Sequence, residues 1–161
     1  MSEPAPPPPR RPSVRLSPDE AWEAIEAAHT GIFTSMRRDG TPISLPLWFV
    51  VEDRKIWLST PPGAKKVSRV RHNPRCSFLV ETGERWAELK AVHLTGDAHL
   101  FEGEKVAWVD AAKDKKYAAF KTARQSMPTE TRQHYEVPKV GICFVPDERI
   151  VSWDNARLDL K

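Results

Sequence analysis

The residues best suited to bind a ligand lie in one basic stretch, residues 59–75. Its last thirteen residues carry five Lys and Arg side chains and no acidic one. A helix predicted over residues 64–72 would offer free amides and the positive end of its dipole at its N-terminus, where anions bind. Thr60, Lys65 and Lys66 add a hydroxyl and two ammonium groups at that end. We therefore predict a phosphate site; the alternative is that the charges form only the solvated face of a short helix.

A second candidate surface lies on a strand predicted over residues 41–51. Side chains alternate between the two faces of a strand, so the odd-numbered residues 43–51 should enter the core. The outward-facing set is Ser44, Pro46 and Trp48. We expect this strand to pair with the one over residues 55–60, so that a planar cofactor with its phosphate at Lys66 lies along both. The alternative is that Trp48 packs against a helix or another subunit.

The elements that must position these residues are mainly strands. Asp39-Gly40 between two alternating segments indicates a hairpin, and Pro46 indicates an edge strand or a bulge because proline cannot donate to a sheet. Ser17, followed by a proline and then by Glu20, is typical of a helix start. We predict further helices over 64–72 and 104–123, a bulge at Gly96, and strands over 31–37, 41–51, 55–60, 75–81, 86–101, 139–145 and 149–153. Mostly antiparallel strands with few helices favour a small closed or split barrel.

Other patterns that would carry chemistry are missing from the sequence. It contains no GxSxG, HExxH, P-loop or GxGxxG motif, so hydrolase, zinc protease and Rossmann functions have no support. Cys76 and Cys143 are far apart and form no CxxC pair, and we interpret them as reduced core thiols. His93 and His99 share a strand face but lie about 20 Å apart at about 3.3 Å per residue, so we expect no metal site.

The 161 residues fit one domain preceded by a proline-rich tail. Six of the fifteen prolines fall within the first twelve residues. We predict a disordered tail over residues 1–15, or at most a weak docking peptide, and a cofactor-binding domain over residues 16–161. Two units of the net charge of +3 belong to the tail, so the domain is nearly neutral and we expect no nucleic-acid partner. With neither a membrane-length apolar run nor a secretory signal, we expect a cytoplasmic protein without membrane association.

Taken in order from Leu16, the segments resemble a known family. The matching features are the Asp39-Gly40 hairpin, Pro46-Leu47-Trp48, Ile56-Trp57-Leu58-Ser59-Thr60, the basic helix with Lys66, Asn73-Pro74-Arg75-Cys76-Ser77-Phe78 and Ser152-Trp153-Asp154. Together they resemble the flavin/deazaflavin oxidoreductases of family B, in the pyridoxamine 5'-phosphate oxidase-like superfamily. The resemblance implies a mainly β (α+β) fold, a six-stranded antiparallel split β-barrel with flanking helices that binds FMN or coenzyme F-420. It also implies a homodimer with cofactor sites at its interface.

The resemblance further implies roles for ten residues. It assigns the cofactor phosphate to Thr60 and Lys66, with cationic support from Lys65, Arg69 and Arg71, and it counts Ser59 among the cofactor-binding residues. It assigns the cofactor ring to Ser44, Pro46 and Trp48, with Trp153 approaching from the partner subunit. Interpreted from the residues alone, Trp153 belongs to the core, to a dimer contact or to a pocket wall.

The function implied by the resemblance is an oxidoreductase that uses coenzyme F-420 to transfer a hydride to an unsaturated or otherwise electrophilic small molecule. Coenzyme F-420 has an anionic oligoglutamate tail that FMN lacks, so a site rich in Lys and Arg suits coenzyme F-420 better. The alternatives are an FMN-dependent oxidoreductase of the same fold and a non-enzymatic flavin- or haem-binding protein. The C-terminal Arg/His motif of true pyridoxamine phosphate oxidases is not recognisable, so we do not expect vitamin B6 oxidation. No residue stands out as the catalytic acid.

Overall fold

The computed structural model describes residues 13–158 and contains seven strands and four α-helices in that range. The strands are β1 (Gly31–Met36), β2 (Pro42–Leu47), β3 (Val50–Glu52), β4 (Lys55–Thr60), β5 (Arg75–Thr82), β6 (Lys90–Phe101) and β7 (Val140–Asp154). The α-helices are α1 (Pro18–Ala27), α2 (Lys65–His72), α3 (Glu104–Lys116) and α4 (Thr129–Glu136). The family resemblance implied six strands; the seventh arises because the segment predicted as one strand over 41–51 forms two.

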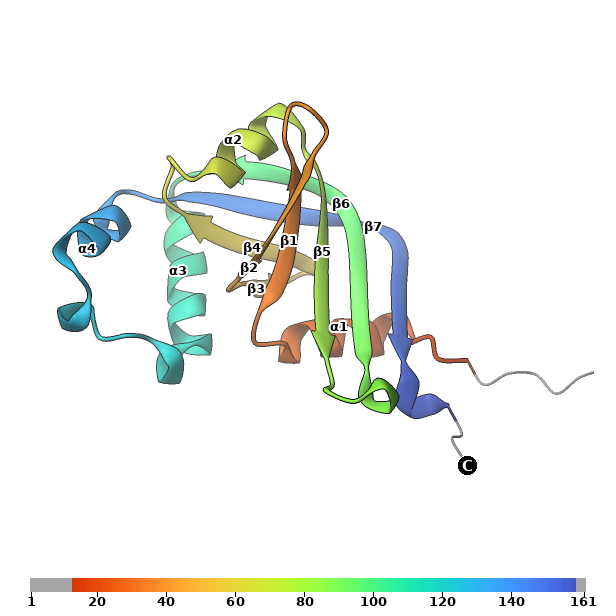
Figure 1. The fold of residues 1–161 in the computed structure, drawn as a ribbon. Helices are drawn as coiled ribbons and strands as arrows, with labels where there is room; N and C mark the ends of the chain where they lie inside the picture. The colour runs from red at the N-terminus through yellow and green to blue at the C-terminus, as the bar shows by residue number, and fades with distance from the viewer. Residues whose placement is uncertain (1–12, 159–161) are drawn as a thin grey trace, which may run out of the picture.

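All seven strands belong to one antiparallel sheet, in the order β2-β1-β5-β6-β7-β4-β3. Its two edge strands, β2 and β3, are consecutive in the sequence and are joined only by Trp48 and Phe49. This short link brings the two edges of the sheet together, so the sheet must curl, as Figure 1 shows. The result is an antiparallel half-barrel with flanking helices, consistent with a split barrel.

The break at Trp48 and Phe49 corrects the expected pairing of the second hairpin strand. β2 pairs with β1, with Ile32 opposite Pro46, while only β3 pairs with β4. β2 therefore lies at a sheet edge, as Pro46 indicated. Leu45 was expected in the core but is 40% exposed, because β2 has a neighbouring strand on one side only.

The hydrophobic core fills the inside of the curled sheet. β1 and β4 alternate buried and half-buried residues along their whole length. Phe33, Phe49, Phe78 and Phe144 pack together in this core, and the rings of Phe49 and Phe78 meet edge to face at 4.9 Å. Because Phe49 is fully buried, the link between β2 and β3 is anchored in the core.

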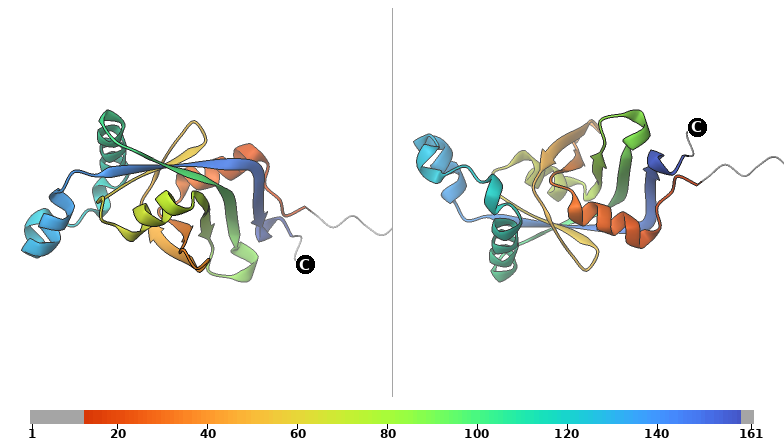
Figure 2. Two further views of the ribbon diagram at one scale, coloured as in Figure 1. Left: turned by 90° about the horizontal axis from the view of Figure 1, so that it is seen from above. Right: turned by 90° about the horizontal axis from the view of Figure 1, so that it is seen from below.

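The helices cover the ends and one side of the half-barrel. α1 and α2 lie at opposite ends of the curled sheet, and α4 lies farther out than α3 (Figures 1 and 2). α1 begins as predicted, because the amide of Ser17 donates to the Glu20 carboxylate at 2.8 Å and the amide of Glu20 donates to Ser17 Oγ at 3.3 Å. The helix predicted over 104–123 ends at Lys116 instead. α4 was not predicted, and none of its residues is buried, so it leaves no hydrophobic pattern in the sequence.

Three further features concern β6 and β7. β6 begins at Lys90 because residues 86–88 form a 3-10 turn rather than the start of a strand. β7 is one continuous strand where the sequence indicated two, because it pairs with β6 on both sides of an irregularity. That irregularity is the predicted bulge, a shift in register between Leu94 and Gly96. A Cβ atom at Gly96 would lie 2.2 Å from the Val145 carbonyl oxygen, so the close approach requires glycine.

The described chain begins alongside β7. The carbonyl of Val14 accepts a hydrogen bond from the Asp154 amide at 2.8 Å, and the amide of Leu16 donates to Ser152 Oγ at 3.1 Å. The tail predicted over residues 1–15 lies, up to residue 12, outside the described residues.

Candidate functional site

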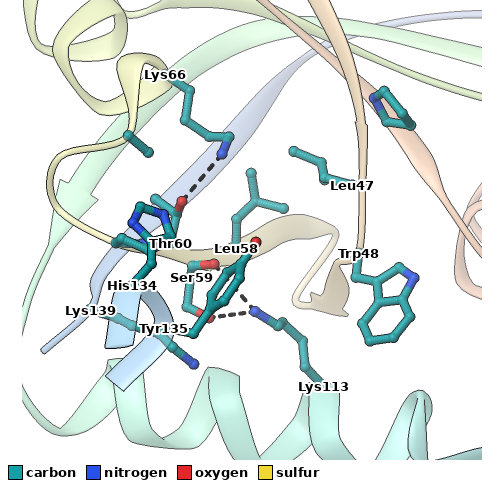
Figure 3. A pocket seen from close by; sticks show the side chains of 13 residues that line it. Leu47, Trp48, Leu58, Ser59, Thr60, Lys66, Lys113, His134, Tyr135 and Lys139 are labelled. Carbon is teal, nitrogen blue, oxygen red and sulfur yellow. Dashed lines mark hydrogen bonds between the residues drawn. The ribbon is translucent and has the colours of Figure 1, made fainter. Parts of the chain in front are cut away.

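A cavity of about 360 Å³ lies beside the C-terminal end of β4 (Figure 3). Its volume falls within the roughly 300–1,000 Å³ typical of ligand pockets. Residues far apart in the sequence form its walls: Pro46, Leu47, Trp48, Leu58, Ser59, Thr60, Pro61, Ala64, Lys66, Lys113, His134, Tyr135 and Lys139. Three of these side chains are lysines, so the cavity is suited to an anionic ligand.

At one end of the cavity, Lys66 Nζ donates a hydrogen bond to Thr60 Oγ1 at 3.2 Å. Val67 and Val70 are buried and hold α2 on the sheet, which turns Lys66 toward β4. Burial, followed by the nearby Arg69 charge, lowers the pKa of Lys66. A bound anion would relieve both effects, because it would supply the counter-charge that this ammonium group lacks.

The start of α2 adds backbone donors to the same end. Its N-cap residue is Ala64, which has no side chain able to cap the helix, and the first turn contains no acidic residue. The free amides of this turn and the helix dipole therefore remain available to an anion beside Lys66.

At the other end of the cavity, α3 contributes a hydrogen-bonded network. Lys113 Nζ donates to Ser59 Oγ at 2.6 Å and to the Ser59 carbonyl at 3.3 Å. Ser59 Oγ donates to Asp110 Oδ1, and Lys139 Nζ donates to Asp110 Oδ2 at 2.9 Å. Figure 3 shows Lys66 and Lys113 approaching β4 from opposite sides. The network therefore fixes the Lys113 and Lys139 ammonium groups at the end of the cavity opposite Lys66.

The pKa values of this network follow from burial and pairing. Burial lowers the pKa of Lys113, although the Asp110 carboxylate opposes the shift. Burial alone would raise the pKa of Asp110, but the hydrogen bonds from Ser59 and Lys139 outweigh it and lower that pKa. Asp110 thus stays ionised, whereas Lys113 releases its proton more readily than an exposed lysine.

Trp48 forms the side wall of the cavity and is itself held by aromatic neighbours. Its indole stacks on Tyr117, with ring centres 4.3 Å apart and planes 1° from parallel. The His29 ring meets Trp48 and Tyr117 edge on, at 6.1 Å and 5.4 Å. Trp48 therefore packs against the end of α3, as the alternative interpretation expected, and it also lines the cavity.

The structure brings five of the ten sequence-predicted residues to the cavity: Pro46, Trp48, Ser59, Thr60 and Lys66. The other five lie elsewhere. Ser44 is exposed and its hydroxyl hydrogen bonds to that of Thr34 at 2.8 Å. Arg69 Nε donates to Ser35 Oγ at 2.8 Å, on the β1 side of α2. Lys65 and Arg71 are exposed on the surface of α2.

Trp153 lies far from the cavity within the same chain. β7 pairs with Thr60 through Val140, whereas Trp153 is thirteen residues farther along and pairs with Ala91. Its predicted approach to a cofactor therefore needs a second copy of the chain.

Sequence analysis did not identify Asp110, Lys113 and Lys139. Asp110 and Lys113 stand three residues apart within the helix predicted over 104–123 and so share a face, which is a local signal for a pair. No local sequence pattern links that pair to Ser59, which is more than fifty residues away in the chain.

Two other expectations concern cysteine chemistry and metals. Cys76 and Cys143 are both free and buried, as predicted. Across residues 13–158 no three His, Cys, Asp or Glu side chains are grouped so that they could hold a metal ion.

Among the helices of residues 13–158, none is long and apolar enough to cross a membrane.

Comparison with known proteins identifies the family. The pyridoxamine 5'-phosphate oxidase family model matches residues 17–140. No protein with a curated description matches the sequence. A conserved hypothetical protein of Mycobacterium tuberculosis, Rv2991, has a similar structure, with a TM-score of 0.77 and 27% identity over 92% of this chain and 91% of that chain.

Two more distant structures share the fold. A FAD-binding protein of Mesorhizobium loti has a TM-score of 0.64 and 18% identity, covering 85% of this chain and 94% of that chain. An F-420 reductase has a TM-score of 0.64 and 16% identity, covering 84% of this chain and 98% of that chain. The family match and the curled antiparallel sheet agree, and the chain belongs to the pyridoxamine 5'-phosphate oxidase-like family of split barrels.

Proposed function

We propose that this protein binds coenzyme F-420 in the cavity beside β4 and transfers a hydride between it and a small electrophilic molecule. The observation that carries the proposal is the pair formed by Lys66 Nζ and Thr60 Oγ1 at the start of α2, in a cavity whose side wall is Trp48. A cation, a hydroxyl and free helix amides suit a phosphate, and an indole suits a planar ring. The residues present therefore fit a phosphorylated flavin-type cofactor.

In this proposal, the phosphate lies between Lys66, Thr60 and the first amides of α2. Lys66 supplies a charge-assisted hydrogen bond, which is stronger than a bond between neutral groups. Thr60 is 6% exposed and already orients its hydroxyl toward Lys66, so the two groups need little rearrangement to hold an anion. This preorganisation reduces the entropic cost of binding.

The cofactor ring would lie along the Pro46–Trp48 wall. When bound, the reduced cofactor supplies a hydride, which is one proton with two electrons, and the acceptor then takes up a second proton. Lys113 Nζ bears a proton on this wall of the cavity, and its lowered pKa favours proton release. Ser59 and Asp110 hold that ammonium group in position.

Coenzyme F-420 is favoured over FMN by the charges outside the cavity. Lys65 and Arg71 are exposed on α2, where carboxylates that extend out of the cavity can reach them. Two structures with the same fold, an F-420 reductase and a FAD-binding protein, support a flavin or deazaflavin ligand. An FMN-dependent enzyme, or a non-enzymatic flavin- or haem-binding protein, remains the alternative function.

The proposed cofactor site also includes a second copy of the chain. Trp153 cannot reach the cavity of its own chain, and the apolar side chains of Leu45 and Val151 are 40% and 42% exposed. Burying such surface between two copies would stabilise a homodimer and bring Trp153 toward the other cavity. Light scattering on a sizing column tests the dimer directly, and a monomer at micromolar concentration contradicts it.

The cofactor proposal is tested by titrating the purified protein with coenzyme F-420, FMN and haem and measuring each Kd. We expect micromolar or tighter binding of coenzyme F-420 and weaker binding of the other two. Tight binding of FMN with none of the deazaflavin would overturn the choice of cofactor. Turnover has its own assay, the loss of reduced-cofactor absorbance only when an acceptor is present.

A further inference from the structure

A second cavity adjoins the first on the side of the connection between α3 and α4. It also has a volume of about 360 Å³, and it shares four wall residues with the first cavity: Trp48, Lys113, Tyr135 and Lys139. The two cavities therefore adjoin beside Trp48. A transfer between two bound molecules requires their reacting atoms to come within about 3.5 Å of each other, and adjoining cavities can bring two molecules that close.

The wall of the second cavity carries exposed aromatic side chains. Phe120 is 61% exposed and Tyr135 is 54% exposed, and both face this cavity together with Met127. Within residues 13–158, the large hydrophobic side chains that are exposed include three aromatic ones, and two of them line this one cavity. Exposed aromatic surface gathered in a hollow indicates a binding site for a flat apolar molecule.

The charges around the same cavity are mainly positive. Four cationic side chains line it, against two carboxylates. Asp110 is paired with Lys113 and Lys139, and Asp114 is paired with Lys121. Among the residues that the structure describes, Arg124 has no carboxylate partner, so it is the cation best able to bind an anionic group of a ligand.

We infer that the second cavity binds the hydride acceptor and selects flat, apolar molecules that carry an anionic group. This inference rests on the proposed function for its assignment of the acceptor role. Phe120 and Tyr135 contact the apolar part, and the Arg124 guanidinium binds the anionic group. Trp48 lines both cavities, so the acceptor and the cofactor ring would lie beside each other at this residue.

The test uses two fluorescent probes of similar shape, the anionic anilinonaphthalene sulfonate and the neutral N-phenylnaphthylamine. In the full-length protein, Arg124→Gln should raise the Kd of the anionic probe at least about fivefold and leave the Kd of the neutral probe within about twofold. Phe120→Ala should weaken both probes. The matched controls are Arg85→Gln and Trp86→Ala, which alter an exposed cation and an equally exposed aromatic side chain in the β5–β6 connection. They should change neither Kd.

The same titration is repeated in saturating coenzyme F-420 to separate this inference from the proposed function. The anionic probe should still bind, because the cofactor fills only the first cavity. If the cofactor displaces the probe competitively, the second cavity holds the cofactor's own anionic tail and the acceptor assignment is overturned. If Arg124→Gln and Arg85→Gln act alike on the anionic probe, the anion site itself is overturned, whether or not the cofactor binds. Failure of the unaltered protein to bind coenzyme F-420 overturns the proposed function and the acceptor role, even where the probes keep the expected pattern.

Discussion

The stacked rings of Trp48 and Tyr117, 4.3 Å apart, connect the closure of the barrel to the end of α3. Trp48 belongs to the two-residue link between the sheet edges, and Tyr117 immediately follows α3. The Tyr117 hydroxyl also accepts a hydrogen bond from the Phe49 amide and donates one to the Phe49 carbonyl, both at 3.1 Å. One tyrosine therefore satisfies the backbone of the link and positions the indole that lines both cavities.

Tyr117→Phe should lower the free energy of unfolding by about 1–3 kcal/mol, because it leaves buried amide and carbonyl groups of Phe49 without their partner. Urea denaturation measures this change. Tyr135→Phe is the matched control, since Tyr135 is 54% exposed, and it should change the free energy of unfolding by less than about 0.5 kcal/mol. Equal effects of the two substitutions would show that the Tyr117 hydroxyl does not stabilise the link.

Local sequence signals predicted much of the fold. The Ser17 cap and the Gly96 bulge each depend on a few neighbouring residues, and both are confirmed. The break between β2 and β3 was missed because alternation continues through Trp48 and Phe49, while the break itself comes from closing the sheet on itself. Closure is a property of all seven strands, so no local pattern predicts it.

In the candidate site, too, local signals predicted some contacts and the packing of the whole fold determines the others. Thr60 and Lys66 are six residues apart across one turn, and the structure brings them together as the sequence predicted. The side chain of Arg69 donates to Ser35 instead, on the β1 side of α2. Charge and spacing predicted an anion site near Thr60, but only the packing of α2 against the sheet selects which cation faces the cavity.

Lys66→Met should weaken the binding of coenzyme F-420 by about 10–100-fold, the range expected when one charge-assisted hydrogen bond worth about 1.5–3 kcal/mol is lost. Lys115→Met is the matched control because Lys115 is an exposed lysine on α3 that lines neither cavity. We expect it to change the Kd by less than about threefold. Quenching of cofactor fluorescence measures both values, and similar losses at the two positions would contradict a phosphate contact at Lys66.

Gly96→Ala should destabilise the protein by about 1–3 kcal/mol, because the added Cβ atom would press on backbone atoms of β7 that cannot move aside singly. Gly63→Ala should have no such cost. A Cβ atom at Gly63 meets nothing within 4 Å, and replacing glycine there reduces the freedom of the unfolded chain by up to about 1 kcal/mol. Thermal unfolding should therefore show a lower melting temperature for Gly96→Ala and an unchanged or higher one for Gly63→Ala. An unchanged melting temperature for Gly96→Ala would mean that the bulge accommodates the added atom without strain.

Lys113 should titrate at lower pH than an ordinary lysine. Burial lowers the pKa of Lys113 from the ordinary value of 10.5 in spite of the Asp110 carboxylate, and the neighbouring charge of Lys139 acts in the same direction as burial. Carbon-13 NMR of labelled lysine side chains measures this pKa, with the Lys113 signal assigned by its loss in Lys113→Met. A Lys113 pKa at or above 10.5 would contradict a buried ammonium group beside Ser59.

The same shift gives stability a pH dependence of known sign. Between the lowered pKa of Lys113 and 10.5, Lys113 binds more protons in the unfolded chain than in the folded protein, so its contribution to the free energy of unfolding increases with pH in that window. Lys113→Met removes this contribution and should flatten the increase, whereas Lys115→Met should leave it unchanged. Urea denaturation at several pH values above neutrality compares the slopes. A steeper slope in Lys113→Met would mean that Asp110 holds the ammonium group in its charged form more strongly than burial opposes it.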